Sequence, residues 1–350
     1  MVKSETQVPR VAGQADVTQR AESGSSPGAE PSLSVVRQYL LSCGSSSIAD
    51  RAFSALMLVC ALSIFAIVVL ILVELISGSK LTIQKFGMPF FFGSAWDPVN
   101  GNFGALPFIY GTVVSSILSL IIAVPLAVGV AIFLTEMCPA FLRSFLAFFT
   151  ELLAAIPSVV YGLWAVFVMV PLLRQYLYPL LIKTLGWTGI FAGPNYGYGM
   201  FSAGVILSIM ILPIISSLTR EVISAVPYSQ REAVLALGAT RWEMIRMGVL
   251  RNARIGIVGA VILGLGRALG ETMAVTMVIG NRPEIARSLL APAYSMASVI
   301  ANEFSEAADD LSRSALIEIG LALFIVTIIV NALARVLVWA VTRGAPVRGT

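Results

Sequence analysis

The sequence contains no histidine and only three cysteines. Histidine is a common general base and metal ligand, so histidine-based acid–base pairs, serine–histidine triads and histidine-ligated metal sites are excluded. Cys43, Cys60 and Cys138 lie far apart in the sequence, with neither a zinc-binding spacing nor the spacing of a redox pair. We therefore expect this chain to contain no catalytic residue and no metal site.

Charged residues are also scarce. Asp, Glu, Lys and Arg make up 12% of the chain, whereas about 25% is usual for soluble domains. Hydrophobic residues make up 57%, which is too many to bury in one core, so lipid must surround much of the chain. The net charge of +4 does not indicate a nucleic-acid-binding protein. No lysine follows a glycine, so the chain has no P-loop and is expected to bind no nucleotide cofactor itself.

Residues 1–50 differ in composition from everything that follows. They are rich in Ser, Gly, Pro and Glu and lack apolar periodicity, which predicts a disordered tail. Beyond them, six apolar segments are each long enough to cross about 30 Å of hydrocarbon as a helix. The sequence therefore predicts an all-α polytopic membrane protein. Its transmembrane domain covers 51–345, with spans at about 52–76, 108–135, 144–173, 199–219, 255–280 and 314–340.

Lysine and arginine are distributed unequally between the two sides of this arrangement. Both termini and the connections on their side carry fourteen of them, and the opposite connections carry seven. Cytoplasmic connections of membrane proteins are enriched in these residues. We therefore predict that both termini are cytoplasmic, which agrees with an even number of spans, and that the chain's main non-protein contact is membrane lipid.

The cytoplasmic connection between the fourth and fifth spans has regular local signals. Ser229-x-x-Glu232 and Thr240-x-x-Glu243 both match a capping box, the pattern that begins a helix. Gly238 lies between them, where a helix would end in a left-handed residue. The pattern predicts two short amphipathic helices. They would either lie on the membrane surface or dock into the groove of a soluble partner, and the pattern alone leaves both open.

Two ionisable residues lie in the middle of the fifth span. Arg267 and Glu271 are four residues apart, so they are predicted to share one helical face, flanked by Thr272 and Thr276. A charged side chain near the bilayer centre costs about 2.5–3.5 kcal/mol and usually faces the bundle interior or a water-filled path. The pair would serve either as an internal ion pair or in a substrate path, because the arginine fork suits an oxyanion.

A second charged pair, Arg220-Glu221, follows the fourth span on the cytoplasmic side. It would either form an inner gate or cap the helix end with adjacent counter-charges. The second role is favoured by the sequence, since charges at a span end commonly reach the interface.

Glu232-Ala233-Val234 followed by Gly238 resembles the E-A-A-x-x-x-G loop of ABC-importer permeases. Between about residues 50 and 340 the chain also resembles the C-type permease subunits of Pst phosphate importers. The strings that carry this resemblance are FGALPFIYGT (103–112), ELLAAIPSVVYGLW (151–164), LGLGRALGETMAVTMVIGN (263–281) and ANEFSEA (301–307).

The resemblance implies a type I ABC-importer permease (MetI-like) fold in the bacterial inner membrane. It implies that the 228–250 loop forms coupling helices that contact an ATPase through Glu232, Ala233, Gly238, Thr240 and Glu243. The expected partners are a second homologous permease subunit, two copies of the ATPase, which use ATP and Mg, and an extracytoplasmic phosphate-binding protein. The chain itself would not be an enzyme.

Three alternatives remain open. The chain could be a permease for another oxyanion, such as sulfate or molybdate. It could be a proton-coupled secondary transporter that uses Glu271, or a membrane sensor or scaffold that transports nothing.

Overall fold

A computed structural model describes residues 47–342. The disordered tail that the sequence predicts falls almost entirely outside the described residues. Within them the chain is helical, and its only extended pairings are two isolated bridges, Asp97–Asn102 and Gly280–Ala293. Among residues 47–342, six helical segments are long and apolar enough to cross a membrane, which confirms the predicted fold class: Asp50–Gly78, Leu106–Met137, Ser158–Thr188, Met200–Ser224, Arg241–Leu269 and Asp310–Val336.

The contacts divide the chain into two units, Met1–Leu70 and Ile71–Thr350. The described part of the first unit belongs to α3 (Ser47–Gly78), where every residue from 50 to 70 is exposed. A helix that is apolar on all sides is suited to lipid rather than water.

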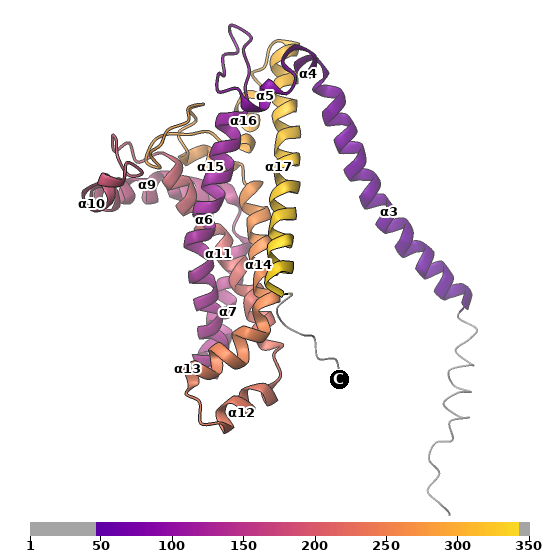
Figure 1. The fold of residues 1–350 in the computed structure, drawn as a ribbon, viewed down its shortest axis with the longest axis vertical. Helices are drawn as coiled ribbons and strands as arrows, with labels where there is room; N and C mark the ends of the chain where they lie inside the picture. The colour runs from indigo at the N-terminus through magenta and orange to yellow at the C-terminus, as the bar shows by residue number, and fades with distance from the viewer. Residues whose placement is uncertain (1–46, 343–350) are drawn as a thin grey trace, which may run out of the picture. The chain divides into compact units, whose positions relative to one another are not determined.

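The second unit holds the remaining elements (Figure 1). In chain order they are α4 (Lys80–Phe86), α5 (Pro89–Phe92), α6 (Leu106–Ile132), η2 (Phe133–Met137), α7 (Ala140–Ala155), α8 (Ser158–Trp164), η3 (Ala165–Met169), α9 (Val170–Leu172), η4 (Leu173–Leu177), α10 (Tyr178–Leu185), η5 (Gly186–Thr188), α11 (Met200–Ser224), α12 (Tyr228–Ala236), α13 (Arg241–Glu243), η6 (Met244–Leu250), α14 (Arg251–Leu269), α15 (Met273–Val278), α16 (Met296–Glu303) and α17 (Asp310–Thr342). The segments η3, η4 and η6 are π-helical turns within longer helices, and η2 is the π-helical last turn that follows α6.

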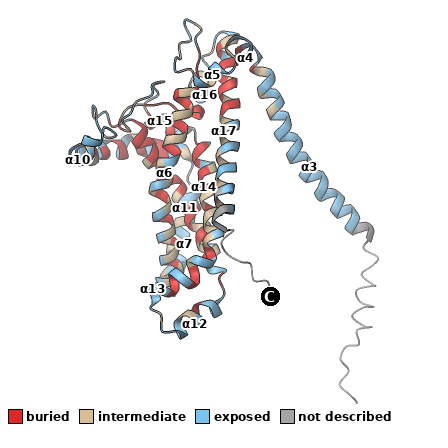
Figure 2. Cartoon of the chain, viewed as in Figure 1, coloured by how far each residue is buried: buried red, intermediate tan, exposed pale blue. Residues whose placement is uncertain are grey.

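Helix α11 is the centre of this unit, packing against α6 and α14. In its most hydrophobic 18-residue stretch, 67% of residues are buried. Small residues allow the close approach: a Cβ on Gly204 of α11 would lie 2.5 Å from the Leu118 side chain of α6. Figure 2 shows the buried residues inside the unit and the exposed ones over α12 and α13. In lipid the hydrophobic effect does not drive helices together, so their association depends on the close packing that such small residues allow.

The third span differs from its prediction. The expected helix over 144–173 is broken at Ile156, which is extended (ψ 130°), so that α7 ends there and the apolar helix begins again at Ser158. Pro157 is the cause, because proline lacks an N–H and disfavours the helical conformation in the residue before it. The segment that is long enough to span is therefore Ser158–Thr188.

The fifth span also differs. The helix that was expected over 255–280 begins at Arg241 and stops at Leu269. Gly270 interrupts it, and the short helix α15 follows, with the Glu271 carboxylate accepting a 3.4 Å hydrogen bond from the Ala274 N–H. Glycine is a poor residue inside a helix, and a carboxylate at a helix start offers the free N–H groups an alternative partner.

Candidate functional site

The loop between α11 and α13 forms one of the two predicted capping boxes. Thr240 accepts a hydrogen bond from the Glu243 N–H, and the Glu243 carboxylate accepts one of 2.8 Å from the Thr240 N–H, as predicted. The box predicted at Ser229 is wrong. Helix α12 starts directly after Pro227, so Ser229 is already the second helical residue and makes no cap. Gly238 has φ +82°, the left-handed conformation expected between the two helices.

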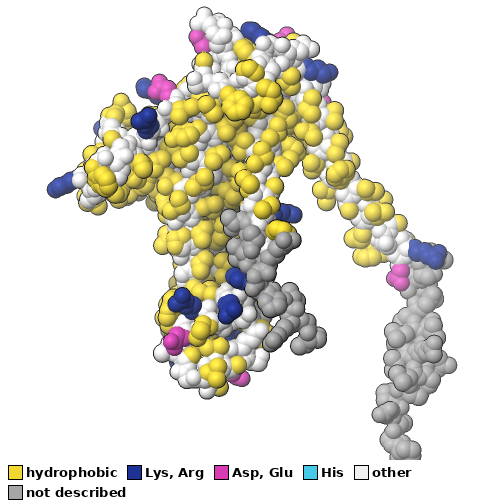
Figure 3. All heavy atoms as spheres, viewed as in Figure 1, with side chains coloured by type: hydrophobic (Ala, Val, Ile, Leu, Met, Phe, Trp, Pro, Cys, Tyr) yellow, Lys and Arg dark blue, Asp and Glu magenta, His cyan; other side chains and the backbone are white. Residues whose placement is uncertain are grey.

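The tip of this loop exposes large apolar side chains. Leu237 is 88% exposed, Tyr228 75% and Trp242 62%. Glu232 and Ala233 are exposed beside them on α12. Figure 3 shows hydrophobic side chains along the middle of the unit, and charged side chains around this end. Apolar groups that are exposed in a polar region mark an interaction surface.

A shallow pocket of about 440 Å³ lies beside this tip. Its lining comes from both short helices and the turn between them: Val234, Leu237, Gly238, Ala239, Glu243 and Met247. The predicted loop residues Gly238 and Glu243 therefore lie together on one concave surface, which suits a protein partner.

The predicted inner-gate residues do not pair with each other. Both lie inside α11, which continues to Ser224, so they do not cap its end. The Arg220 Nη2 donates to the Glu151 Oε1 at 2.6 Å, joining α11 to α7. Glu221 instead lines a separate pocket of about 470 Å³ that also includes Arg335. Adjacent residues of a helix point in different directions, which explains why they have separate neighbours.

The predicted pair in the fifth span is separated by the helix break. Arg267 lies in the last turn of α14 and is exposed, whereas Glu271 lies beyond Gly270 and is 9% exposed. They therefore do not share a helical face, and no ion pair joins them in the described chain. The physical reason is the interruption at Gly270, whose backbone (φ −95°, ψ 1°) departs from the α-helical conformation.

The two threonines predicted beside the pair are engaged with the backbone. Thr276 Oγ1 donates to the Thr272 carbonyl at 2.7 Å, and Thr272 Oγ1 donates to the Gly270 carbonyl at 3.4 Å. Glu271 and Thr272 thus sit at a non-helical segment within an otherwise apolar helix. In a membrane, non-helical backbone is tolerated only where protein buries it or where it lines a cavity.

Sequence reasoning missed Arg231, which is 8% exposed although it belongs to the polar loop. Its guanidinium is bound to Glu136, 95 residues earlier in the sequence. No local pattern signals this contact, because it depends on where η2 and α12 meet in the folded chain.

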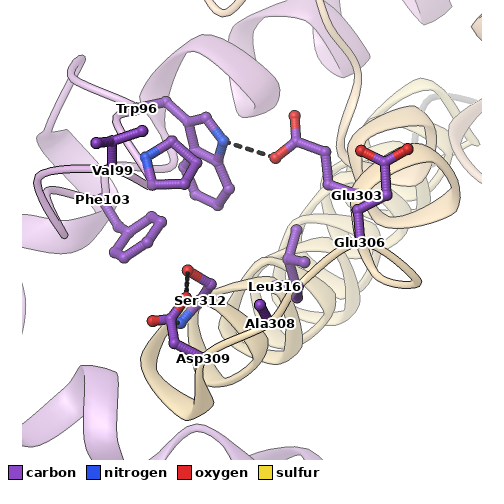
Figure 4. A pocket seen from close by; sticks show the side chains of 11 residues that line it. Trp96, Val99, Phe103, Glu303, Glu306, Ala308, Asp309, Ser312 and Leu316 are labelled. Carbon is purple, nitrogen blue, oxygen red and sulfur yellow. Dashed lines mark hydrogen bonds between the residues drawn. The ribbon is translucent and has the colours of Figure 1, made fainter.

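The extracytoplasmic end carries an acidic pocket of about 430 Å³ (Figure 4). Trp96 and Phe103 form one wall, and Glu303, Glu306 and Asp309 contribute carboxylates. The Trp96 Nε1–H donates to Glu303 Oε2 at 2.8 Å. Burial raises the pKa of the Glu303 carboxyl above its usual range, and the Trp96 hydrogen bond opposes that shift. Ionised carboxylates gathered on one surface repel anions.

We expect Trp96→Phe to lower the Tm of the detergent-solubilised protein by about 2–4 °C near pH 7, since a hydrogen bond to a charged group contributes about 1.5–3 kcal/mol before solvent screening. The pKa of Glu303 is higher in the folded protein than in the unfolded chain. Its carboxyl group therefore stabilises the fold at pH values below the unfolded pKa, and this stabilisation is lost as the pH rises through the folded pKa. The donor matters most once the carboxylate is ionised, so the Tm loss should shrink toward pH 4.

Trp187→Phe is the matched control, because Trp187 is 85% exposed. Thermal denaturation of both variants at several pH values measures the difference. A Tm loss in Trp96→Phe that is independent of pH would contradict the assigned hydrogen bond.

Comparison with known proteins identifies the chain's relatives. Residues 123–343 match the family model described as binding-protein-dependent transport system inner membrane component. The phosphate transport system permease protein PstC of Mesorhizobium japonicum is 48% identical over 77% of this chain and 85% of the relative. PstC of Haemophilus influenzae is 46% identical over 79% of this chain and 89% of the relative. The MetNI methionine ABC transporter, in an inward-facing structure, aligns at 18% identity with a TM-score of 0.47 over 68% of this chain and 94% of that chain. The chain belongs to the family of binding-protein-dependent transport system inner membrane components and, within it, to the PstC group.

Proposed function

We propose that this chain is a permease subunit of an ATP-driven importer of inorganic phosphate, and that its domain 51–345 forms half of the translocation path. The observation that carries the proposal is the likeness over 77% of the chain to relatives that are named for phosphate transport. The six apolar helices of the described residues suit a membrane subunit, and ATP hydrolysis would belong to a separate partner chain.

The loop at 228–250 would dock onto the ATPase. Its exposed Leu237 and Trp242, and the turn at Gly238, support this assignment because they offer an apolar, shaped surface on the cytoplasmic side. The complete importer would contain a second homologous permease subunit, two copies of the ATPase, which bind ATP and Mg, and an extracytoplasmic phosphate-binding protein.

The substrate path would pass the break in the fifth span. Arg267 would hold a phosphate oxyanion through its planar fork, and Glu271, Thr272 and Thr276 would line the path beside it. The exposure of Arg267 and the interruption at Gly270 support this assignment. Arg220 and Glu221 would act at the inner mouth, where the Arg220–Glu151 ion pair joins two helices that must separate if a gate opens there.

The test is uptake of labelled phosphate into proteoliposomes that hold the complete complex, with and without the ATPase. Uptake that requires ATP and the ATPase, and that excess sulfate or molybdate does not inhibit, is expected. Preferential uptake of sulfate or molybdate would indicate another oxyanion. Uptake without the ATPase that disappears when the proton gradient is collapsed would indicate a secondary transporter using Glu271, and no uptake under any condition would indicate a sensor or scaffold.

A further inference from the structure

Arg231 of α12 is buried, and the carbon of its guanidinium lies 4.9 Å from the ring centroid of the exposed Tyr228. Its side chain is only 10% exposed, and that of its partner Glu136, on η2, is 9% exposed. The Nε and Nη2 groups of Arg231 donate to Glu136 Oε1 at 3.2 and 2.9 Å. A buried charge pair is tolerated only where further hydrogen bonds satisfy both partners.

The remaining donors of Arg231 reach the end of α11. Nη2 donates to the Ile223 carbonyl at 3.0 Å, and Nη1 donates to the Val226 carbonyl. The Ile223 carbonyl also accepts a 3.2 Å hydrogen bond from the Val226 N–H, so the guanidinium adds a second donor at this helix end, where carbonyls lack the usual partners within the helix. One side chain therefore joins three elements: α12, the end of the second span and the end of the fourth span.

The other flank of α12 is attached to the fifth span. Asn252 Nδ2 of α14 donates to Gln230 Oε1 and to the Gly248 carbonyl, both at 2.7 Å. Gly248 lets η6 lie against α12, since a Cβ there would be 3.3 Å from a Val234 methyl group. The inner side of α12 is thus attached to spans two, four and five.

Non-helical residues flank α12 at both ends, so it is not continuous with the neighbouring helices. Pro227 precedes it with extended backbone (ψ 141°), and Gly238 follows it with positive φ and no neighbouring atom within 4 Å of a Cβ. Without its side-chain contacts, α12 would rotate about these two non-helical positions when a partner displaces it. Its movement reaches the spans only if its inner contacts hold.

We propose that Arg231 is the positioning residue that makes the second span move with α12, through its bonds to Glu136. This inference rests on the proposed function of α12 as the element that contacts the ATPase. Displacement of α12 during the ATP cycle is then transmitted to η2 and α6, which packs along α11 in the interior of the unit.

The first test compares Arg231→Gln and Glu136→Ala in the complete importer. Glu136 is not on the docking surface, so Glu136→Ala leaves the contact with the ATPase intact. We expect both variants to retain the ATPase on purification and to hydrolyse ATP, while phosphate transported per ATP falls by about tenfold, which corresponds to about 1.4 kcal/mol of coupling. Arg251→Gln, at an exposed arginine of α14, is the control and should transport normally.

An unchanged ratio of phosphate to ATP in both variants, with normal assembly, overturns the proposal. Loss of the ATPase from Arg231→Gln, combined with normal coupling in Glu136→Ala, also overturns it, because Arg231 would then only shape the docking surface.

The second test measures the connection directly. Spin labels are placed at Met137 and Ala236, both exposed, in a chain whose native cysteines have been replaced and which retains uptake. The distance between the labels should stay the same in the nucleotide-free and nucleotide-trapped complex of the otherwise native chain. It should change or broaden on trapping in Arg231→Gln. A change of the distance in the native background contradicts a rigid connection.

These outcomes are separable from a failure of the proposed function. Cross-linking from Ala236 to the ATPase in the native complex tests docking alone. If that cross-link is absent, the assignment of α12 as the docking element fails. If it forms and the variants couple normally, only the role of Arg231 fails.

Discussion

Replacing Gly238 with valine should reduce the amount of ATPase that co-purifies with this chain by about tenfold, equivalent to about 1.4 kcal/mol of binding free energy. Gly238 has φ +82°. A non-glycine residue in the left-handed region costs about 1–2 kcal/mol, and β-branched residues are especially disfavoured there. No atom lies within 4 Å of a Cβ placed at Gly238, so the effect acts through the backbone rather than through a steric clash. Membrane insertion should be unaffected, because the turn lies outside the spans.

Gly238→Asn is the matched control. Asparagine also adds a side chain at this position, but it tolerates the left-handed conformation, so this variant should keep most of the ATPase. Quantitative affinity purification from mild detergent compares the variants at equal permease yield. Full retention of the ATPase by the valine variant would count against docking and would favour a loop that lies on the membrane surface.

The sequence predicted those features that depend on local signals. Six spans could be recognised because about twenty apolar residues are needed to cross the bilayer, and each span meets that requirement by itself. The Thr240–Glu243 capping box could be predicted because both partners lie within one turn. The prediction of a box at Ser229 was wrong because the helix begins earlier, directly after Pro227. The predicted bounds of the third span were wrong because Pro157 interrupts the helix within a continuous hydrophobic run.

Contacts between distant segments could not be predicted from one sequence. Arg231 belongs to a polar loop, and only the folded chain brings Glu136 beside it. Glu318 of α17 is a second example: it is fully buried, and neither carboxylate oxygen has a hydrogen-bond partner in the described part of the chain. Burial of this kind is set by neighbouring helices, whose packing the hydrophobic pattern does not specify.

Exchange of Arg267 for lysine should reduce phosphate uptake by about tenfold or more, and should impair the uptake of every other oxyanion that the complex transports. Lysine keeps the positive charge but loses the planar fork that donates two parallel hydrogen bonds to two oxygens. Each tenfold loss corresponds to about 1.4 kcal/mol, which is within the contribution of one hydrogen bond to a charged group. Uptake of labelled phosphate by the assembled complex measures the effect. Normal uptake in Arg267→Lys would show that the fork takes no part in the path.

Glu271→Gln should act differently, because it removes a negative charge and leaves the local fold intact. The glutamine amide oxygen can still accept the hydrogen bond from the Ala274 N–H, so α15 should still begin at the same place. A carboxylate beside the path would accept a hydrogen bond from the P–OH group of phosphate but repel sulfate, which has no proton to donate at neutral pH. In a medium of low dielectric constant that repulsion is strong. We therefore expect the phosphate-over-sulfate ratio, measured as phosphate uptake in competition with excess sulfate, to fall by about tenfold. Uptake of phosphate alone should change much less. If the phosphate-over-sulfate ratio stays constant in a normally assembled complex, Glu271 serves only to start α15, and selectivity must arise elsewhere along the path.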